Sequence, residues 1–141
     1  MNIKKIILNT GFIFLLEFIF YISLFSSITP YLIYILLFSC IVGSIITLIS
    51  SWNSKKISNI INIILNIIIT ILFIAQLVHF RFYHSIFSIY SMVNGAQVFD
   101  FFGAIMKVIL NNIFNLLIFF IPLILFFIIN RKIEFKKINI K

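Results

Sequence analysis

Charged residues are scarce in this sequence of 141 residues, since Asp, Glu, Lys and Arg together make up only 10% of it. Three of them are acidic and eleven are basic, so the formal net charge is +8. Hydrophobic residues reach 63%, and the mean hydropathy is +1.25, far above the values of water-soluble domains. This scarcity of charge excludes an ordinary soluble domain and indicates an integral membrane protein.

Cysteine is almost absent as well, because Cys40 is the single one. A disulfide within the chain and a cysteine-rich metal site are therefore excluded. His79 and His84 are five positions apart, and this spacing does not place two metal ligands on one helical face. The sequence also lacks a serine, histidine and acid set at a common depth, a glycine-rich phosphate loop and a carboxylate pair. We predict that the chain by itself is not an enzyme and has no catalytic residues, metal site or cofactor.

Long apolar runs predict an all-α integral membrane fold, with four transmembrane helices in a single domain of residues 1–141. A helix crosses about 30 Å of hydrocarbon with roughly 20 residues. The predicted spans are residues 6–28, 31–50, 57–80 and 108–130, and Pro122 is expected to kink the last span. We interpret the first span as a retained anchor, because it exceeds the hydrophobic region of a signal peptide, which has about 7–15 residues.

The basic residues predict the orientation of these spans. Cytoplasmic loops are enriched in Lys and Arg, and nine of the eleven basic residues lie at the two termini or between the second and third spans. We therefore expect both termini on the cytoplasmic side of the plasma membrane. The expected partners are membrane lipids, including anionic phospholipid, and not nucleic acid. The nine residues are Lys4, Lys5, Lys55, Lys56, Arg131, Lys132, Lys136, Lys137 and Lys141.

The remaining segment, residues 81–107, is predicted to lie outside, but it is too apolar for a loop in water. On a helix, Gln97, Asp100 and Lys107 share one side and large apolar residues take the other. We expect an amphipathic interfacial helix between the third and fourth spans. It is either a connector packed on the bundle or a contact site for lipid head groups or substrate. In the second case Arg81 joins these three residues, because its guanidinium can hold a phosphate through two hydrogen bonds. The alternative for Arg81 is that its side chain only extends from the helix end toward water.

Glu17 lies near the centre of the first span, where a charged side chain costs roughly 2.5–3.5 kcal/mol on insertion scales. It should be uncharged or paired, with Asn66 and Gln76 as candidate partners. It is either a structural group hydrogen-bonded to a neighbouring helix or a proton or ion site. Two further sets of small or polar residues each share one helical face and favour helix packing. They are Asn59, Asn62, Asn66 and Thr70 on the third span, and Cys40, Gly43 and Thr47 on the second.

Residues 74–112, IAQLVHFRFYHSIFSIYSMVNGAQVFDFFGAIMKVILNN, resemble the membrane region of the lipoteichoic acid synthase-like family of phosphoglycerol transferases and sulfatases. The shared features, in order, are an aromatic-Arg-aromatic exit from the third helix, a serine and aromatic segment, a Gly-x-Gln-Val turn and an aromatic pair. Residues 15–39 are similar to the first hairpin of that family. His79 stands where the family often has tyrosine, and Ala96 where it often has glycine.

The resemblance implies a membrane-anchor portion that corresponds to the first four of the family's five helices. Members of the family continue into an extracellular domain of the alkaline phosphatase superfamily, where a threonine nucleophile and a divalent metal, typically manganese, transfer glycerol phosphate from phosphatidylglycerol. The chain is therefore expected to be a truncated product or a stand-alone relic, with a further membrane helix or a catalytic domain as partner. The alternative is a small multi-pass channel, transporter or accessory subunit that depends on Glu17.

Overall fold

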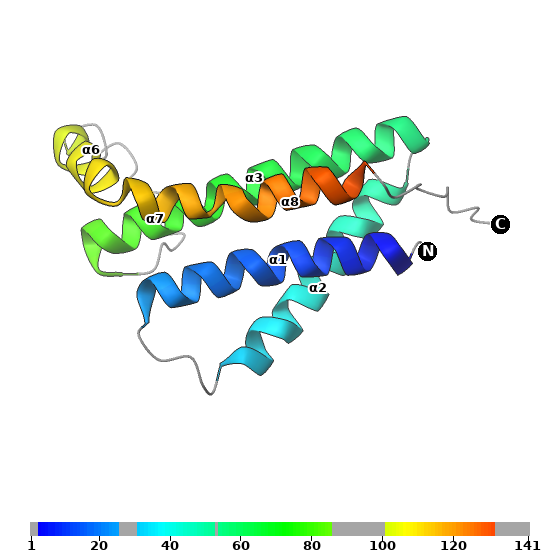
Figure 1. Cartoon of the computed structure of the whole chain (residues 1–141), viewed down its shortest axis with the longest axis horizontal. Helices are drawn as coiled ribbons and strands as arrows, with labels where there is room; N and C mark the ends of the chain where they lie inside the picture. Colours follow the sequence, from blue (N-terminus) through cyan, green and yellow to red (C-terminus); the bar gives the residue numbers. More distant parts are fainter. Residues whose placement is uncertain (1–2, 26–30, 53, 86–100, 132–141) are drawn as a thin grey trace.

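The computed structural model describes residues 3–25, 31–52, 54–85 and 101–131, which are helical almost throughout (Figure 1). No strand occurs in these described ranges, so the predicted all-α fold is confirmed. The helices are α1 (Ile3–Leu24), α2 (Leu32–Ser51), α3 (Lys55–Tyr83), α6 (Phe102–Asn111), α7 (Ile113–Ile118) and α8 (Phe120–Asn130).

Four helical stretches of the described chain are long and apolar enough to cross a membrane. Many of their large apolar side chains point outward, such as Ile33, which is 71% exposed. Apolar surface on this scale is suited to contact with lipid and not with water. The four stretches are Ile3–Leu24, Leu32–Ser51, Lys56–Tyr83 and Ile113–Asn130. Their number agrees with the four predicted spans, and they define a helical, multi-pass membrane protein.

The helix α1 lies at the centre of the bundle and packs against α2, α3 and α8. Figure 1 shows α3 and α8 running beside α1, whereas α2 crosses α1 obliquely. The C-terminal end of α2 lies near the start of α3, and its N-terminal end lies away from the other helices. The N-terminus, the connection from α2 to α3 and the end of α8 therefore gather at one end of the bundle.

A close contact between α1 and α2 fixes their crossing point at Gly43. A Cβ atom built on Gly43 would lie 2.6 Å from the backbone nitrogen of Thr10 and 2.7 Å from its Cα. No other residue type fits there without moving the backbone of α1. The predicted packing role of Gly43 thus has a steric basis, since small residues let two membrane helices approach closely.

The fourth span differs from its predicted range, because residues 108–111 belong to α6 and the membrane-length stretch begins at Ile113. At the break, the side chain of Asn112 donates to the carbonyl oxygen of Val108 at 2.9 Å, to which its backbone N–H also donates at 3.1 Å. Such side-chain bonds compete with the regular helical pattern. In Figure 1, α6 turns away from the direction of α7 and α8.

Pro122 is expected to kink the last span. In the structure the helix is interrupted at Phe119, between α7 and α8. Proline has no N–H to donate to the carbonyl four positions earlier, which belongs to Ile118. The N–H of Phe119 instead bonds to the carbonyl of Leu116, three positions back, at 3.2 Å. The interruption therefore lies one turn before the proline.

The third helix extends past its predicted end at residue 80 and reaches Tyr83. His84 then ends it in a left-handed conformation, with φ of 53°, and its N–H bonds to the carbonyl of Phe80. Gln97 and Asp100 of the predicted interfacial helix lie outside the described residues, while Lys107 lies in α6 and is exposed. Placement of this helix at the membrane interface stays a prediction.

Candidate functional site

Polar side chains gather between α1, α2 and α3 near the end of the bundle that carries the N-terminus. We call them the polar cluster, and all of them are buried. Its members are Lys5 and Asn9 from α1, Thr47 from α2, and Ser58, Asn62 and Asn66 from α3. Side-chain hydrogen bonds between membrane helices add roughly 0.6 kcal/mol each on average, so this cluster joins the three helices.

Asn9 is the centre of the polar cluster, because its amide bonds to two other helices. Its Nδ2 donates to Oγ1 of Thr47 at 2.9 Å and to Oδ1 of Asn62 at 3.0 Å. Its Oδ1 accepts from Nδ2 of Asn66 at 3.3 Å. The opposite amide atoms, Nδ2 of Asn62 and Oδ1 of Asn66, are buried and have no partner within the described part of the chain. The cluster thus joins the three helices through side-chain hydrogen bonds, while two of its buried amide atoms have no hydrogen-bond partner among the described residues.

Lys5 was counted in the sequence only among the basic residues that predict the cytoplasmic end, but it lies inside the bundle. Its side chain is 1% exposed, and Nζ donates to Oγ of Ser58 at 2.7 Å. Asn9 was not predicted as a site residue at all. One signal could have found both, because Lys5, Asn9, Phe12 and Leu16 follow one another at spacings of three and four, as residues on the inner face of a helix do.

The predicted packing faces are largely borne out by the structure. Asn62, Asn66 and Thr70 are buried on α3, as are Gly43 and Thr47 on α2. Asn59 is half-buried and accepts a hydrogen bond of 2.7 Å from Nδ2 of Asn130, which links α3 to α8. Cys40 is the exception, because it is exposed and faces away from the other helices. The pattern correctly located the faces but included one residue too many.

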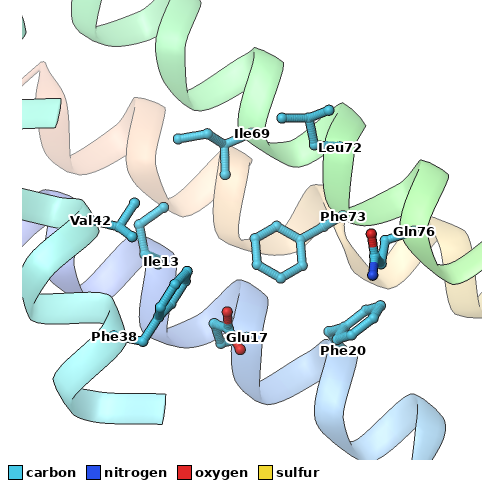
Figure 2. Close-up of a pocket in the computed structure, with 9 residues that line it drawn as sticks. All are labelled: Ile13, Glu17, Phe20, Phe38, Val42, Ile69, Leu72, Phe73 and Gln76. Atoms are coloured by element: carbon cyan, nitrogen blue, oxygen red, sulfur yellow. The ribbon is translucent and has the colours of Figure 1, made fainter. Parts of the chain in front are cut away.

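Glu17 lies in a second polar site, a cavity of about 320 Å³ between α1, α2 and α3. Figure 2 shows its carboxylate rising from α1 into this space, with Phe38 of α2 on one side and Phe20 on the other. The amide of Gln76 and the ring of Phe73 reach the same space from α3. We call this space the Glu17 cavity. Its full lining is Ile13, Glu17, Phe20, Phe38, Val42, Ile69, Leu72, Phe73 and Gln76.

Of the two partners predicted for Glu17, Gln76 shares the cavity with it and Asn66 does not. Asn66 lies in the polar cluster and bonds to Asn9. Among the described residues, the carboxylate of Glu17 has no hydrogen-bond or ion-pair partner, so the predicted pairing is not seen there. The carboxylate is half-buried and opens into the cavity.

Arg81 and the two histidines lie at the far end of α3. Nη2 of Arg81 donates to the carbonyl of Ser23 at 2.7 Å, and this carbonyl lies in the last turn of α1. A cation there complements the unpaired carbonyls of a helix C-terminus. Nδ1 of His79 donates to the carbonyl of Ser85 at 3.0 Å. Arg81 therefore ties α3 to α1, a role that the sequence did not reveal.

No group of three or more His, Cys, Asp or Glu side chains gathers anywhere in the described ranges. The predicted absence of a metal and of other cofactors stays a prediction. In comparisons with known proteins, no family model, curated protein or solved structure matches this chain.

Proposed function

We propose that this chain is the membrane-anchor portion of a lipoteichoic acid synthase-like phosphoglycerol transferase or sulfatase, and that it performs no chemistry by itself. The observation that carries the proposal is the ordered series of aromatic and small polar residues in residues 74–112. Its partner in the proposal is a catalytic domain, or a further membrane helix leading to one, and any divalent metal belongs to that domain.

The end of this series supports a role at the membrane surface. The helix α6 packs against α3 at the end of the bundle away from the N-terminus (Figure 1). Phe102, Met106 and Leu110 of α6 are exposed and apolar, and Lys107 is exposed beside them. A short helix with this composition suits head-group depth, where apolar side chains enter the lipid and a cation meets phosphate. In the proposal, this region presents lipid head groups to the catalytic domain.

The proposed location is the plasma membrane, with both termini in the cytoplasm. Lys4, the connection between α2 and α3, and Arg131 lie at the same end of the bundle. Basic residues at one end favour the cytoplasmic side for that end. The opposite end, with Arg81 and α6, then faces outward, where a phosphoglycerol transferase needs its lipid substrate.

The genomic DNA downstream of the codon for Lys141 tests the anchor proposal directly. We expect a fifth apolar span there, followed by a coding region with a threonine in a metal-binding motif, either in frame or shifted by a frame. The decisive contrary result is an unrelated gene after a true stop codon, with no remnant of such a domain in any frame.

A further inference from the structure

We propose that the Glu17 cavity is a binding site for a small organic cation, of the class of aryl or alkyl ammonium ions. The inference does not depend on the anchor proposal, because it concerns residues of α1, α2 and α3 alone. The cavity volume of about 320 Å³ lies at the lower end of the range for small-molecule sites, which is about 300–1,000 Å³. An ammonium group with one aromatic or short alkyl substituent suits this size.

The charge of the ligand is argued from Glu17. It is the one ionisable side chain among the nine that line the cavity. A carboxylate at membrane depth is costly unless it is paired, and within the described residues it has no partner. A ligand cation supplies the missing opposite charge. Purely apolar ligands would leave both Glu17 and the Gln76 amide without partners, and this costs free energy.

The organic character of the ligand is argued from the aromatic rings around the carboxylate. Phe20, Phe38 and Phe73 line the cavity from three different helices. The rings of Phe20 and Phe73 meet edge to face, with centroids 5.6 Å apart, so they hold one another in place. Ring faces attract alkylated ammonium ions, and aromatic side chains beside a carboxylate are the usual chemistry for holding them. A bare metal ion would find too few oxygen ligands here.

Access to the cavity is from the membrane side. Phe38 on α2 is 50% exposed and Leu72 on α3 is 59% exposed, so the rim of the cavity is open between these two helices. Figure 1 shows that the N-terminal half of α2 runs away from α3 at this level. A lipophilic cation dissolved in the membrane can therefore reach Glu17 without crossing the bundle.

A matched pair of probes separates charge from shape. Phenyltrimethylammonium and tert-butylbenzene have nearly the same size and shape, but only the first is charged. The protein in detergent micelles is labelled with 15N at glutamine and tryptophan and titrated with each probe. The chain has two glutamines, Gln76 and Gln97, and Gln76→Leu assigns their side-chain amide signals. The indole of Trp52, at the other end of α2, is the internal control.

The expected result is a saturable shift of the Gln76 amide with phenyltrimethylammonium and no shift of the Trp52 indole. The Glu17→Gln variant should bind the cation about tenfold more weakly or worse, because the charge is lost and the shape is kept. Glu17→Asp should retain more of the affinity. The inference is overturned if the cation leaves Gln76 unshifted up to its solubility limit. It is also overturned if tert-butylbenzene shifts Gln76 at the same concentrations. If Glu17→Gln fails to fold, the titrations of the unaltered protein with phenyltrimethylammonium and with tert-butylbenzene still test the inference.

Discussion

Asn9 shows how one polar side chain can organise three membrane helices. Both ends of its amide are used, and its three partners come from α2 and α3. Inside a bundle no water competes for these bonds, so a missing partner leaves a buried polar group unsatisfied. The consequences of replacing Asn9 should therefore reach residues that the mutation does not touch.

We expect Asn9→Leu to lower the free energy of unfolding by about 2 kcal/mol, because it strips the buried atoms Oδ1 of Asn62 and Nδ2 of Asn66 of their partner. Leucine branches at Cγ as asparagine does, with two methyl groups in place of the amide atoms, so the shape of the side chain is nearly kept and the polar groups are lost. Unfolding by SDS in mixed micelles measures the change. The matched control is Asn111→Leu at the exposed end of α6, which should have little effect. Equal stability of the two variants would show that the cluster does not stabilise the fold.

The predictability of the site differs from one residue to the next. The polar face of α3 is predictable because Asn62, Asn66 and Thr70 repeat at helical spacing within an otherwise apolar span. For Lys5 and Asn9 the helical spacing indicates only a shared face of α1, because a lysine before an apolar run has the same local pattern whether it faces the cytoplasm or another helix. Their burial is decided by contacts with α2 and α3, which lie about 40 or more residues away.

At the scale of the elements, the number and order of the membrane-length helices follow from the apolar runs of the sequence. The positions at which helices are interrupted do not. The break at Asn112 depends on its side chain, which bonds to the carbonyl of Val108. Many other asparagines of this chain lie inside unbroken helices, so residue type alone does not distinguish this one. The oblique path of α2 likewise depends on the contact between Gly43 and Thr10, which no local pattern encodes.

The crossing of α1 and α2 should be sensitive to a single methyl group. Gly43→Ala places a Cβ 2.6 Å from the backbone nitrogen of Thr10, and we expect a loss of about 1–3 kcal/mol in stability, since the helix backbones must move apart. Gly11→Ala in α1 is the matched control, because its Cβ meets nothing within 4 Å. There the better helix propensity of alanine should leave stability unchanged or raise it by up to ~1 kcal/mol. The same SDS titration compares them, and an unharmed Gly43→Ala variant would refute the close crossing.

At the scale of the whole molecule, the arrangement brings the start of α1 and the end of α8 to one end of the bundle (Figure 1). The proposed orientation predicts that the connection between α2 and α3 is cytoplasmic. In a Cys40→Ser background, the thiol of Ser54→Cys should not react with an impermeant reagent added to intact cells, because this position lies on the cytoplasmic side of the membrane in the proposed orientation. Ser85→Cys, at the exposed opposite end of α3, should react. Modification of Ser54→Cys from outside would reverse the proposed orientation.

The burial of Lys5 has a consequence for the order of events during biogenesis. Under the proposed orientation, its charge helps to hold the N-terminus in the cytoplasm while α1 enters the membrane. Its partner Ser58 lies 53 residues further along the chain, so synthesis supplies that partner only later. Under this orientation Lys5 acts first as a charge that orients α1 in the membrane. Afterwards it acts as a hydrogen-bond donor that joins α1 to α3. A substitution such as Lys5→Gln would therefore affect two successive steps, the insertion of α1 into the membrane and the later packing of α1 against α3.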